Sequence, residues 1–310
     1  LSHCWGNTPF SACTLTRENE AEFTTAGIPI THLTNNFREA IDVARFIGVK
    51  FIWIDSLCIM QGEGGDFASE GDMMHAVYLN SYCNIVAADS RDSSSGLFQP
   101  REGEDKVGKE EWRGRRREAV PKQVLDEGLW GDELLGAPIY ERGWVFQERM
   151  LSPRLLHFTD TQIFWDCSTL SACEAFPTGI PYHLDQHASI DRHWRARLQA
   201  ASRSPSTSTS KDPPFPTPIG GPKDVSPETF WRTAVQKYTS CLLTNQLDKT
   251  VAIWSVAKLV RDLLPSTETY GGGMWSTRLE EQLAWRVEAS EKSRRLGDLQ
   301  TAWPSWSWAS

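Results

Sequence analysis

The chain has 310 residues, of which 40% are hydrophobic and 23% are charged, proportions that are ordinary for a globular protein. Its formal net charge of −8 argues against a general nucleic-acid-binding role, because there is no excess of cations to neutralise phosphates. It contains no apolar run long enough to span a bilayer, and we expect neither a membrane span nor a signal peptide. Seven cysteines without a Cys-x-x-Cys pair argue against a disulfide framework and indicate an intracellular location, which we expect to be the cytoplasm.

Fourteen tryptophans are many for a chain of this length. Many of them must be buried or half-buried, so we expect an aromatic-rich core in which the indole N–H groups need hydrogen-bond partners. The chain is long enough to bury such a core in one large domain or in two small ones.

The first part of the chain alternates between helix-like and strand-like segments. Asn36 and Glu39 predict a capping box at the start of a helix, whose apolar residues recur at helical spacing until Gly48 ends it. Residues 49–54 follow as a continuous apolar, β-branched and aromatic run, which is typical of a strand covered on both faces. This unit is therefore a helix that leads into a buried strand, with Asp55 at the end of the strand.

A second unit repeats this order. A helix is expected over residues 70–79, and residues 83–88 are expected to form the next buried strand. Two such units in succession predict right-handed crossovers and a mostly parallel sheet with flanking helices, so we interpret residues 1–175 as an α/β core. Residues 89–140 are rich in Ser, Gly, Glu and Arg, and we interpret them as an insertion into this core.

The core continues after the insertion. Residues 143–150 are expected to form a short helix that ends near Pro153. Two strands at residues 155–158 and 162–165 are expected to follow it, either as a hairpin or as two successive strands.

The C-terminal part has a different composition. Residues 200–226 are dense in Ser, Thr and Pro, and we interpret them as a flexible linker. Residues 227–310 are expected to be mainly helical, with Ser226 marking the start of the first helix. At the far end Trp306 and Trp308 alternate with serines, which predicts a half-buried strand that returns to the core.

Four motifs occur along the chain in the order found in one protein family. They are residues 1–6 (Leu-Ser-His-Cys-Trp-Gly), 51–59 (Phe-Ile-Trp-Ile-Asp-Ser-Leu-Cys-Ile), 141–154 (Glu-Arg-Gly-Trp-Val-Phe-Gln-Glu-Arg-Met-Leu-Ser-Pro-Arg) and 303–310 (Trp-Pro-Ser-Trp-Ser-Trp-Ala-Ser). Together they resemble the heterokaryon incompatibility (HET) domain of filamentous fungi, over almost the whole chain. The resemblance implies an intracellular fungal effector that triggers programmed cell death after non-self recognition. It also implies self-association and partnership with other incompatibility proteins or NLR-type proteins.

A shorter motif within the third segment bears on chemistry. The stretch from Trp144 to Glu148 resembles the Trp-x-x-x-Glu motif that carries the catalytic glutamate of Toll/interleukin-1 receptor (TIR) domains, which are flavodoxin-like sheets that cleave NAD. The resemblance implies a flavodoxin/TIR-like fold with Glu148 as the catalytic residue. NAD would then be the substrate, and no cofactor is expected. A carboxylate below the ribose can stabilise the positive charge that develops on the sugar when the bond to nicotinamide breaks.

Other candidate ligand-binding residues lie mainly where strands are expected to end. Ligands of open α/β sheets bind in the crevice beyond the carboxyl ends of the strands. Either of two tryptophans can stack on a ligand, and the sequence does not choose between them. The candidates for contact with a ligand are Ser2, His3, Trp5, Asp55, Ser56 and Trp144.

These candidates also have structural alternatives. Glu148 can form an ion pair with Arg142 or Arg154, and Asp55 can cap the turn that follows it. The sequence has no glycine-rich phosphate-binding fingerprint. That lack favours the alternative function, a non-catalytic signalling or oligomerisation module.

A metal site and a cysteine nucleophile are both disfavoured. His183, His187 and His193 have no Cys or carboxylate partner at a recognised zinc-ligand spacing, so no metal is expected. Cys58 has no local signature of a catalytic Cys–His pair, and a buried cysteine on a strand is usually inert.

Overall fold

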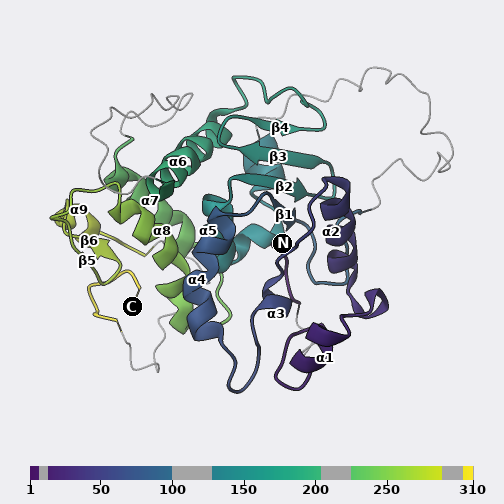
Figure 1. Cartoon of the computed structure of the whole chain (residues 1–310). Coiled ribbons are helices and arrows are strands. Elements are labelled where there is room, and N and C mark those ends of the chain that lie inside the picture. Colours follow the sequence, from purple (N-terminus) through teal and green to yellow (C-terminus); the bar gives the residue numbers. More distant parts are fainter. Residues whose placement is uncertain (7–12, 100–127, 204–224, 288–302, 310) are drawn as a thin grey trace.

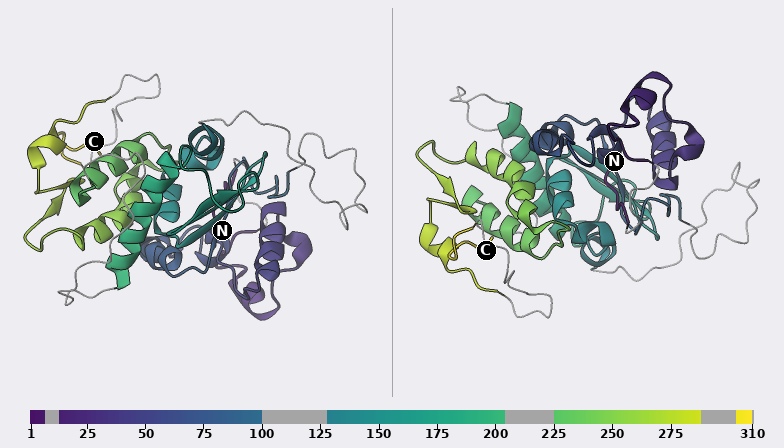
Figure 2. Two further views of the ribbon diagram at one scale, coloured as in Figure 1. Left: turned by 90° about the horizontal axis from the view of Figure 1, so that it is seen from above. Right: turned by 90° about the horizontal axis from the view of Figure 1, so that it is seen from below.

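The computed structural model describes residues 1–6, 13–99, 128–203, 225–287 and 303–309. Within them a four-stranded sheet lies between α2 (Asn35–Phe46) on one face and α5 (Gly143–Leu151) on the other, with α4 (Phe67–Leu79) beside α5 (Figure 1). Figure 2 shows the purple N-terminal segment and the green C-terminal helices on opposite sides of this sheet. The predicted α/β class is confirmed.

The strands follow one another across the sheet in chain order. They are β1 (Asn84–Ala87), β2 (Arg154–Phe158), β3 (Ile163–Cys167) and β4 (Ser171–Cys173). β1 and β2 are parallel, whereas β2, β3 and β4 pair antiparallel, so the sheet is mixed rather than mostly parallel. The short connections after β2 allow only antiparallel pairing, because a parallel neighbour needs a long crossover. After the helix predicted at residues 143–150, which is α5 and is called the motif helix below, the sequence allowed a hairpin or two successive strands. The hairpin is confirmed as β2–β3.

An extended segment at the start of the chain continues the sheet beside β1. Ser2 forms a parallel bridge with Val86, and its N–H donates to the Ile85 carbonyl at 2.8 Å. On the other side of the segment, the Leu1 nitrogen donates to the Trp53 carbonyl at 2.9 Å. The first motif (residues 1–6) therefore lies between the second motif (residues 51–59) and β1.

The strand predicted at residues 49–54 is wrong in part. The segment is extended, but it is not a strand of the sheet. Its apolar run suggested burial on both faces, yet the Phe51 side chain is 88% exposed. Ile54 is buried and leads directly into α3 (Asp55–Cys58), so the segment still places Asp55 at the end of an extended stretch.

Helix α2 forms as predicted, but the predicted capping box does not. The helix begins at Asn35 with Thr34 before it, so Asn36 lies inside the first turn and does not cap it. Its side-chain oxygen instead accepts the Gly96 N–H at 2.7 Å, and Glu39 accepts the Phe98 N–H at 2.9 Å. These two polar side chains therefore hold the loop that follows β1.

Further helices and short strands complete the chain. They are α1 (Glu20–Thr25), η1 (Ile30–His32), η4 (Leu129–Leu134), η5 (Pro138–Glu141), α6 (Gln186–Arg203), α7 (Pro227–Thr239), η6 (Gln246–Lys249), α8 (Val251–Arg261), β5 (Tyr270–Gly271), β6 (Met274–Trp275) and α9 (Leu279–Leu283). Among the described residues, no helix has both the length and the apolar character that a membrane crossing requires.

Helix α6 has 18 residues and was not predicted from the sequence. Its buried residues include Asp191, His193 and Arg195. Arg195 pairs with Asp166 of β3 at 2.5 Å, and Asp191 pairs with Arg149 of α5. Because charged side chains as well as apolar ones face inward, the apolar periodicity that predicts a helix is weak here.

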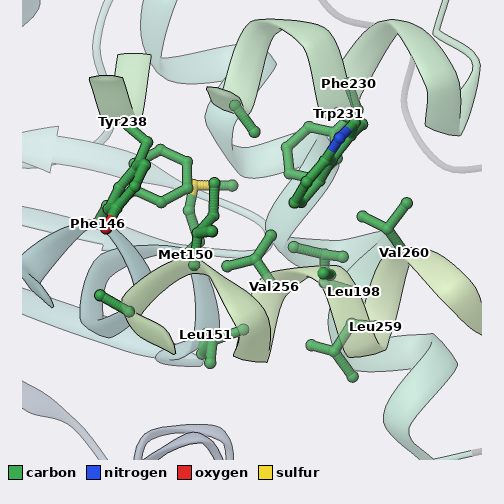
Figure 3. Close-up of a cluster of buried hydrophobic side chains, with 14 of the residues drawn as sticks. Phe146, Met150, Leu151, Leu198, Phe230, Trp231, Tyr238, Val256, Leu259 and Val260 are labelled. Atoms are coloured by element: carbon green, nitrogen blue, oxygen red, sulfur yellow. The ribbon is translucent and has the colours of Figure 1, made fainter. Parts of the chain in front are cut away.

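The C-terminal helices share one hydrophobic cluster with the motif helix α5. Figure 3 shows Phe146 and Met150 of α5 near side chains of α7 and α8, among them Tyr238 and Val256. Ser226 caps α7 as predicted, because its hydroxyl oxygen accepts the backbone N–H of Thr229 at 3.3 Å. The helical character predicted for this part of the chain is confirmed in the residues that the structure describes.

The strand predicted around Trp306 and Trp308 is wrong, because residues 303–309 form turns. The indole N–H of Trp308 donates to the Gly273 carbonyl at 2.8 Å, and that carbonyl also accepts the indole N–H of Trp231 at 3.2 Å. The segment therefore packs on the hairpin of β5 and β6, within the C-terminal cluster. In a strand Trp306 and Trp308 would lie on the same face, whereas in these turns Trp308 is buried and Trp306 is 48% exposed.

Two predicted segments fall largely outside the described residues. Residues 204–224 make up most of the predicted linker, and residues 100–127 make up much of the predicted insertion. The described ends of the insertion pack onto the core, since Trp130 and Ile139 are buried.

Replacing Trp308 with Ala should lower the free energy of unfolding by about 3–5 kcal/mol, because the change removes a buried indole and leaves a cavity. Trp306→Ala is the matched control: this side chain is 48% exposed, and its loss should cost less than about 1 kcal/mol. Urea denaturation followed by circular dichroism measures both values. Equal losses for the two variants would contradict the packing of the C-terminal turn.

Candidate functional site

The start of the motif helix α5 depends on a glycine. The Gly143 N–H donates to the Leu242 carbonyl at 2.9 Å, and Arg142 forms a parallel bridge with Leu242. A Cβ at position 143 would lie 2.6 Å from Leu243 Cδ2, so a glycine lets the two segments approach. This contact holds the start of α5, the helix that carries Glu148.

Glu148 faces the sheet from α5 and is only 6% exposed. The Ser2 hydroxyl donates to Glu148 Oε2, and Asn84 Nδ2 donates to the Ser2 oxygen at 2.9 Å. The Tyr78 hydroxyl of α4 also hydrogen-bonds the carboxyl group. Glu148 therefore joins the first extended segment, the start of β1 and helix α4.

The environment of Glu148 disfavours its charged form. Burial raises the pKa of Glu148 above its ordinary value, and the negative charge of Asp55 acts in the same direction. Hydrogen bonds from Ser2 and Tyr78 and the positive charge of Arg142 lower the pKa, but they do not outweigh burial. A carboxyl group with this balance can bind or release a proton closer to neutral pH than an exposed glutamate.

The two ion pairs considered for Glu148 are not formed. Arg142 Nη1 donates to the His3 carbonyl at 2.5 Å. Arg154 Nη1 donates to the Tyr82 carbonyl at 3.0 Å, and its guanidinium lies 5.2 Å from the centroid of the Tyr82 ring. The structural alternative for Glu148 is therefore a hydrogen-bonded carboxyl group rather than a salt bridge.

A second group of predicted residues gathers around Asp55. The Trp5 indole N–H donates to Asp55 Oδ2 at 2.9 Å, and the Ser56 N–H donates to Asp55 Oδ1 at 2.8 Å. His3 Nδ1 lies 3.7 Å from Asp55 Oδ1. Asp55 is the first residue of α3 rather than its cap, and its bond from Ser56 is to the next residue along the chain, while the contacts with Trp5 and His3 join the first two sequence motifs.

The His3 ring is enclosed without a hydrogen-bond partner on either nitrogen. Burial lowers the pKa of His3 to about 4, although Asp55 acts in the opposite direction, so the imidazole is neutral at physiological pH. The Ser56 hydroxyl is also buried without a hydrogen-bond partner. Unsatisfied buried polar groups cost stability.

Trp144 points away from the Glu148 group (Ser2, Tyr78, Asn84 and Glu148) and from the Asp55 group (His3, Trp5, Asp55 and Ser56). Its indole N–H donates to Asp248 Oδ2 at 3.3 Å, and its ring packs edge-on against Phe67 of α4 at 5.6 Å between centroids. Trp5, in contrast, stacks beside His3 with centroids 6.4 Å apart. Of the two tryptophans considered for stacking on a ligand, Trp5 is the one that lies within the Asp55 group.

A cavity of about 320 Å³ lies beside the Glu148 group. Tyr78, Asn84 and Trp53 line it together with other mostly apolar side chains, and Glu148 does not line it. Tyr78 and Asn84 therefore belong both to the Glu148 group and to the wall of this cavity.

Two residues of the Glu148 group were not predicted to have a role. The predicted helix over residues 70–79 contains Tyr78, and the predicted strand over residues 83–88 contains Asn84. A polar residue in an otherwise apolar strand is the available signal for Asn84, because a buried amide needs hydrogen-bond partners. No comparable signal exists for Tyr78, since a tyrosine on an apolar helix face is ordinary core.

The residue after Glu148 belongs to a separate buried polar cluster. Arg149 pairs with Asp191 of α6, and its guanidinium lies 5.4 Å from the centroid of the Tyr140 ring. The Tyr140 hydroxyl is 2.5 Å from His157 Nδ1. Burial, together with nearby guanidinium groups, holds the pKa of His157 well below its ordinary value.

The fold and the site together define an α/β domain in which a buried glutamate joins the first segment to a motif helix. Residues 1–148 match the protein family described as Heterokaryon incompatibility protein (HET). The match supports a heterokaryon incompatibility domain in this part of the chain, and it includes every candidate site residue from Ser2 to Glu148. It covers less of the chain than the motif resemblance implied. Searches of curated proteins and of solved structures gave no match.

The variant Glu148→Gln should gain stability relative to the wild type as the pH rises. Because the folded-state pKa of Glu148 is raised, burial costs nothing below the unfolded pKa of about 4.3, where both states hold the proton. The cost grows as the pH rises from the unfolded-state pKa to the folded-state pKa and stays constant above it, and an uncharged amide does not incur it. Each unit by which the folded-state pKa exceeds the unfolded-state pKa lowers the wild-type free energy of unfolding by about 1.4 kcal/mol at high pH.

Thermal unfolding of both proteins between about pH 4 and pH 7.5 measures this difference. Glu141→Gln is the matched control, because Glu141 is exposed at the start of the same motif. Its stability difference from the wild type should stay flat across the range. A flat difference for Glu148→Gln, or one of opposite sign, would show that Glu148 is not buried in an environment that disfavours its charge.

Proposed function

We propose that this chain is a fungal heterokaryon incompatibility effector that triggers programmed cell death on non-self recognition. The family match over residues 1–148 supports this proposal, because that segment contains the candidate site. We further propose that the effector acts inside the cell, after self-association or contact with other incompatibility proteins or NLR-type proteins.

We propose NAD hydrolysis as the chemical route, with Glu148 as the catalytic residue. The observation that carries this route is a buried carboxyl group that receives hydrogen bonds from Ser2 and Tyr78 and has no ion-pair partner among the described residues. Such a carboxylate, set against the sugar, stabilises the oxocarbenium-like charge of the transition state. The bonding electrons leave with neutral nicotinamide, water adds to the ribose carbon, and one proton is released.

Access to Glu148 requires a rearrangement in this proposal. With 6% of its surface exposed and its carboxyl group bound by two hydroxyl groups, Glu148 cannot meet a ribose in the described arrangement. Displacement of Ser2 or Tyr78 would open a path, and the ribose hydroxyls would replace their hydrogen bonds. We propose that self-association drives this opening, so that an isolated chain stays inactive.

A non-catalytic signalling or oligomerisation module is the second candidate. The same enclosure of Glu148 favours it, and Glu148 does not line the neighbouring cavity. In this case Glu148 secures the first segment to α5, and the cell-death signal passes to another protein.

The two candidates predict different results for purified protein that is clustered through a fused oligomerisation domain and incubated with NAD. Catalysis predicts release of nicotinamide, reduced by about 100-fold or more in Glu148→Gln, because an electrostatic or general-base contribution of that size is lost. Glu141→Gln should retain wild-type turnover. Chromatography of nicotinamide measures the rates.

The same variants expressed in a filamentous fungus test the cellular role. Cell death that requires Glu148 together with NAD turnover supports the catalytic route. Cell death in Glu148→Gln, with no NAD turnover in the clustered wild type, supports the signalling module. Turnover that survives Glu148→Gln removes this residue from the mechanism.

A further inference from the structure

Helix α6 lies beyond the segment that matches the HET family, yet it contacts the motif helix next to Glu148. Asp191 of α6 pairs with Arg149 of α5, and the two side chains are 6% and 7% exposed. The second oxygen of Asp191 lies 3.4 Å from Lys237 Nζ of α7. Two cations from different helices therefore converge on one buried carboxylate.

Glu148 and Arg149 attach α5 to different parts of the sheet, the first extended segment and β2. The register places Ser2 beside Val86 and Val86 beside His157, so these residues lie side by side on the face that α5 covers. Glu148 is bound by Ser2, on one side of Val86. Arg149 lies near the Tyr140–His157 pair, on the other side. Rotation or sliding of α5 would break both attachments together.

Helix α6 is itself attached to the sheet, one turn beyond Asp191. One turn after Asp191, Arg195 is fully buried and pairs with Asp166 of β3 at 2.5 Å. The Ser171 hydroxyl of β4 donates to the same Asp166 at 2.9 Å. A continuous set of buried charge contacts therefore runs from β3 through α6 to Arg149 of α5.

We propose that Asp191 is a positioning residue for Glu148: by holding Arg149, it fixes the rotation of α5 and keeps the Glu148 carboxyl group against Ser2 and Tyr78. Helix α6 is then part of the functional site, although it lies outside the matched segment. This inference rests on Glu148 being the functional carboxyl group. Its test follows the state of that group directly, so a failure of the NAD route does not decide it.

The test is carbon-13 NMR titration of the Glu148 carboxyl group in the full chain, assigned with Glu148→Gln. In Asp191→Asn, Arg149 is left buried without its carboxylate, next to Glu148, and α5 is free to rotate. An uncompensated positive charge and a looser enclosure both favour the ionised glutamate. The titration midpoint of Glu148 should therefore fall by about one pH unit or more.

Asp185→Asn is the matched control. Asp185 is also buried and pairs with Arg192 at 2.5 Å; Arg192 also donates to the Ser171 hydroxyl at 2.5 Å, and neither residue forms a hydrogen bond or ion pair with α5 among the described contacts. Asp185→Asn should lose stability by a similar mechanism and leave the Glu148 midpoint unchanged. Asp191→Glu keeps a carboxylate for Arg149 and should restore most of the wild-type midpoint.

Equal shifts in Asp191→Asn and Asp185→Asn, or no shift in either, would overturn the proposal. If Asp191→Asn does not fold, Arg149→Lys provides the second measurement. Lysine keeps the charge but replaces the planar guanidinium with a single point of contact, so the Glu148 midpoint should move in the same direction by a smaller amount. An unchanged midpoint in a folded Arg149→Lys protein would likewise overturn the proposal.

Discussion

The hydrogen bond between Ser2 and Glu148 connects two parts of the domain core that are 146 residues apart in the sequence. Ser2 lies in the extended segment beside β1, and Glu148 lies on a helix that follows a long insertion. Neither side chain reaches water to any large extent, so each depends on the other and on Asn84 and Tyr78 for hydrogen bonds. A buried polar contact of this kind specifies one arrangement of the helix on the sheet, because any other arrangement leaves polar groups unsatisfied.

Three parts of the structure around this hydrogen bond have different roles. The apolar cluster of α5 with α7 and α8 supplies burial. The charge contacts from β3 through α6 to Arg149 fix the orientation of α5. The Asp55 group, with Trp5 and His3, closes the end of the first segment and contains polar groups that lack partners.

The sequence predicted local structure well where apolar periodicity was strong, as in α2, α4, β1 and the β2–β3 hairpin. It failed where polar groups do the packing: α6 was missed because Asp191 and Arg195 face inward, and Asn36 was taken for a cap although it holds a distant loop. For the site, local motifs identified Ser2, Asp55 and Glu148, but spacing alone could not separate them into two groups. That separation depends on long-range strand order and on the rotation of α5.

The central claim is that Ser2 and Glu148 stabilise the fold through each other, and a double-mutant cycle tests it most directly. Ser2→Ala, Glu148→Ala and the double variant are unfolded in urea at neutral pH, and the coupling free energy is taken from the three differences. A hydrogen bond to a buried carboxyl group predicts a coupling of about 1.5–3 kcal/mol. Additive effects, with a coupling below about 0.5 kcal/mol, would contradict the account.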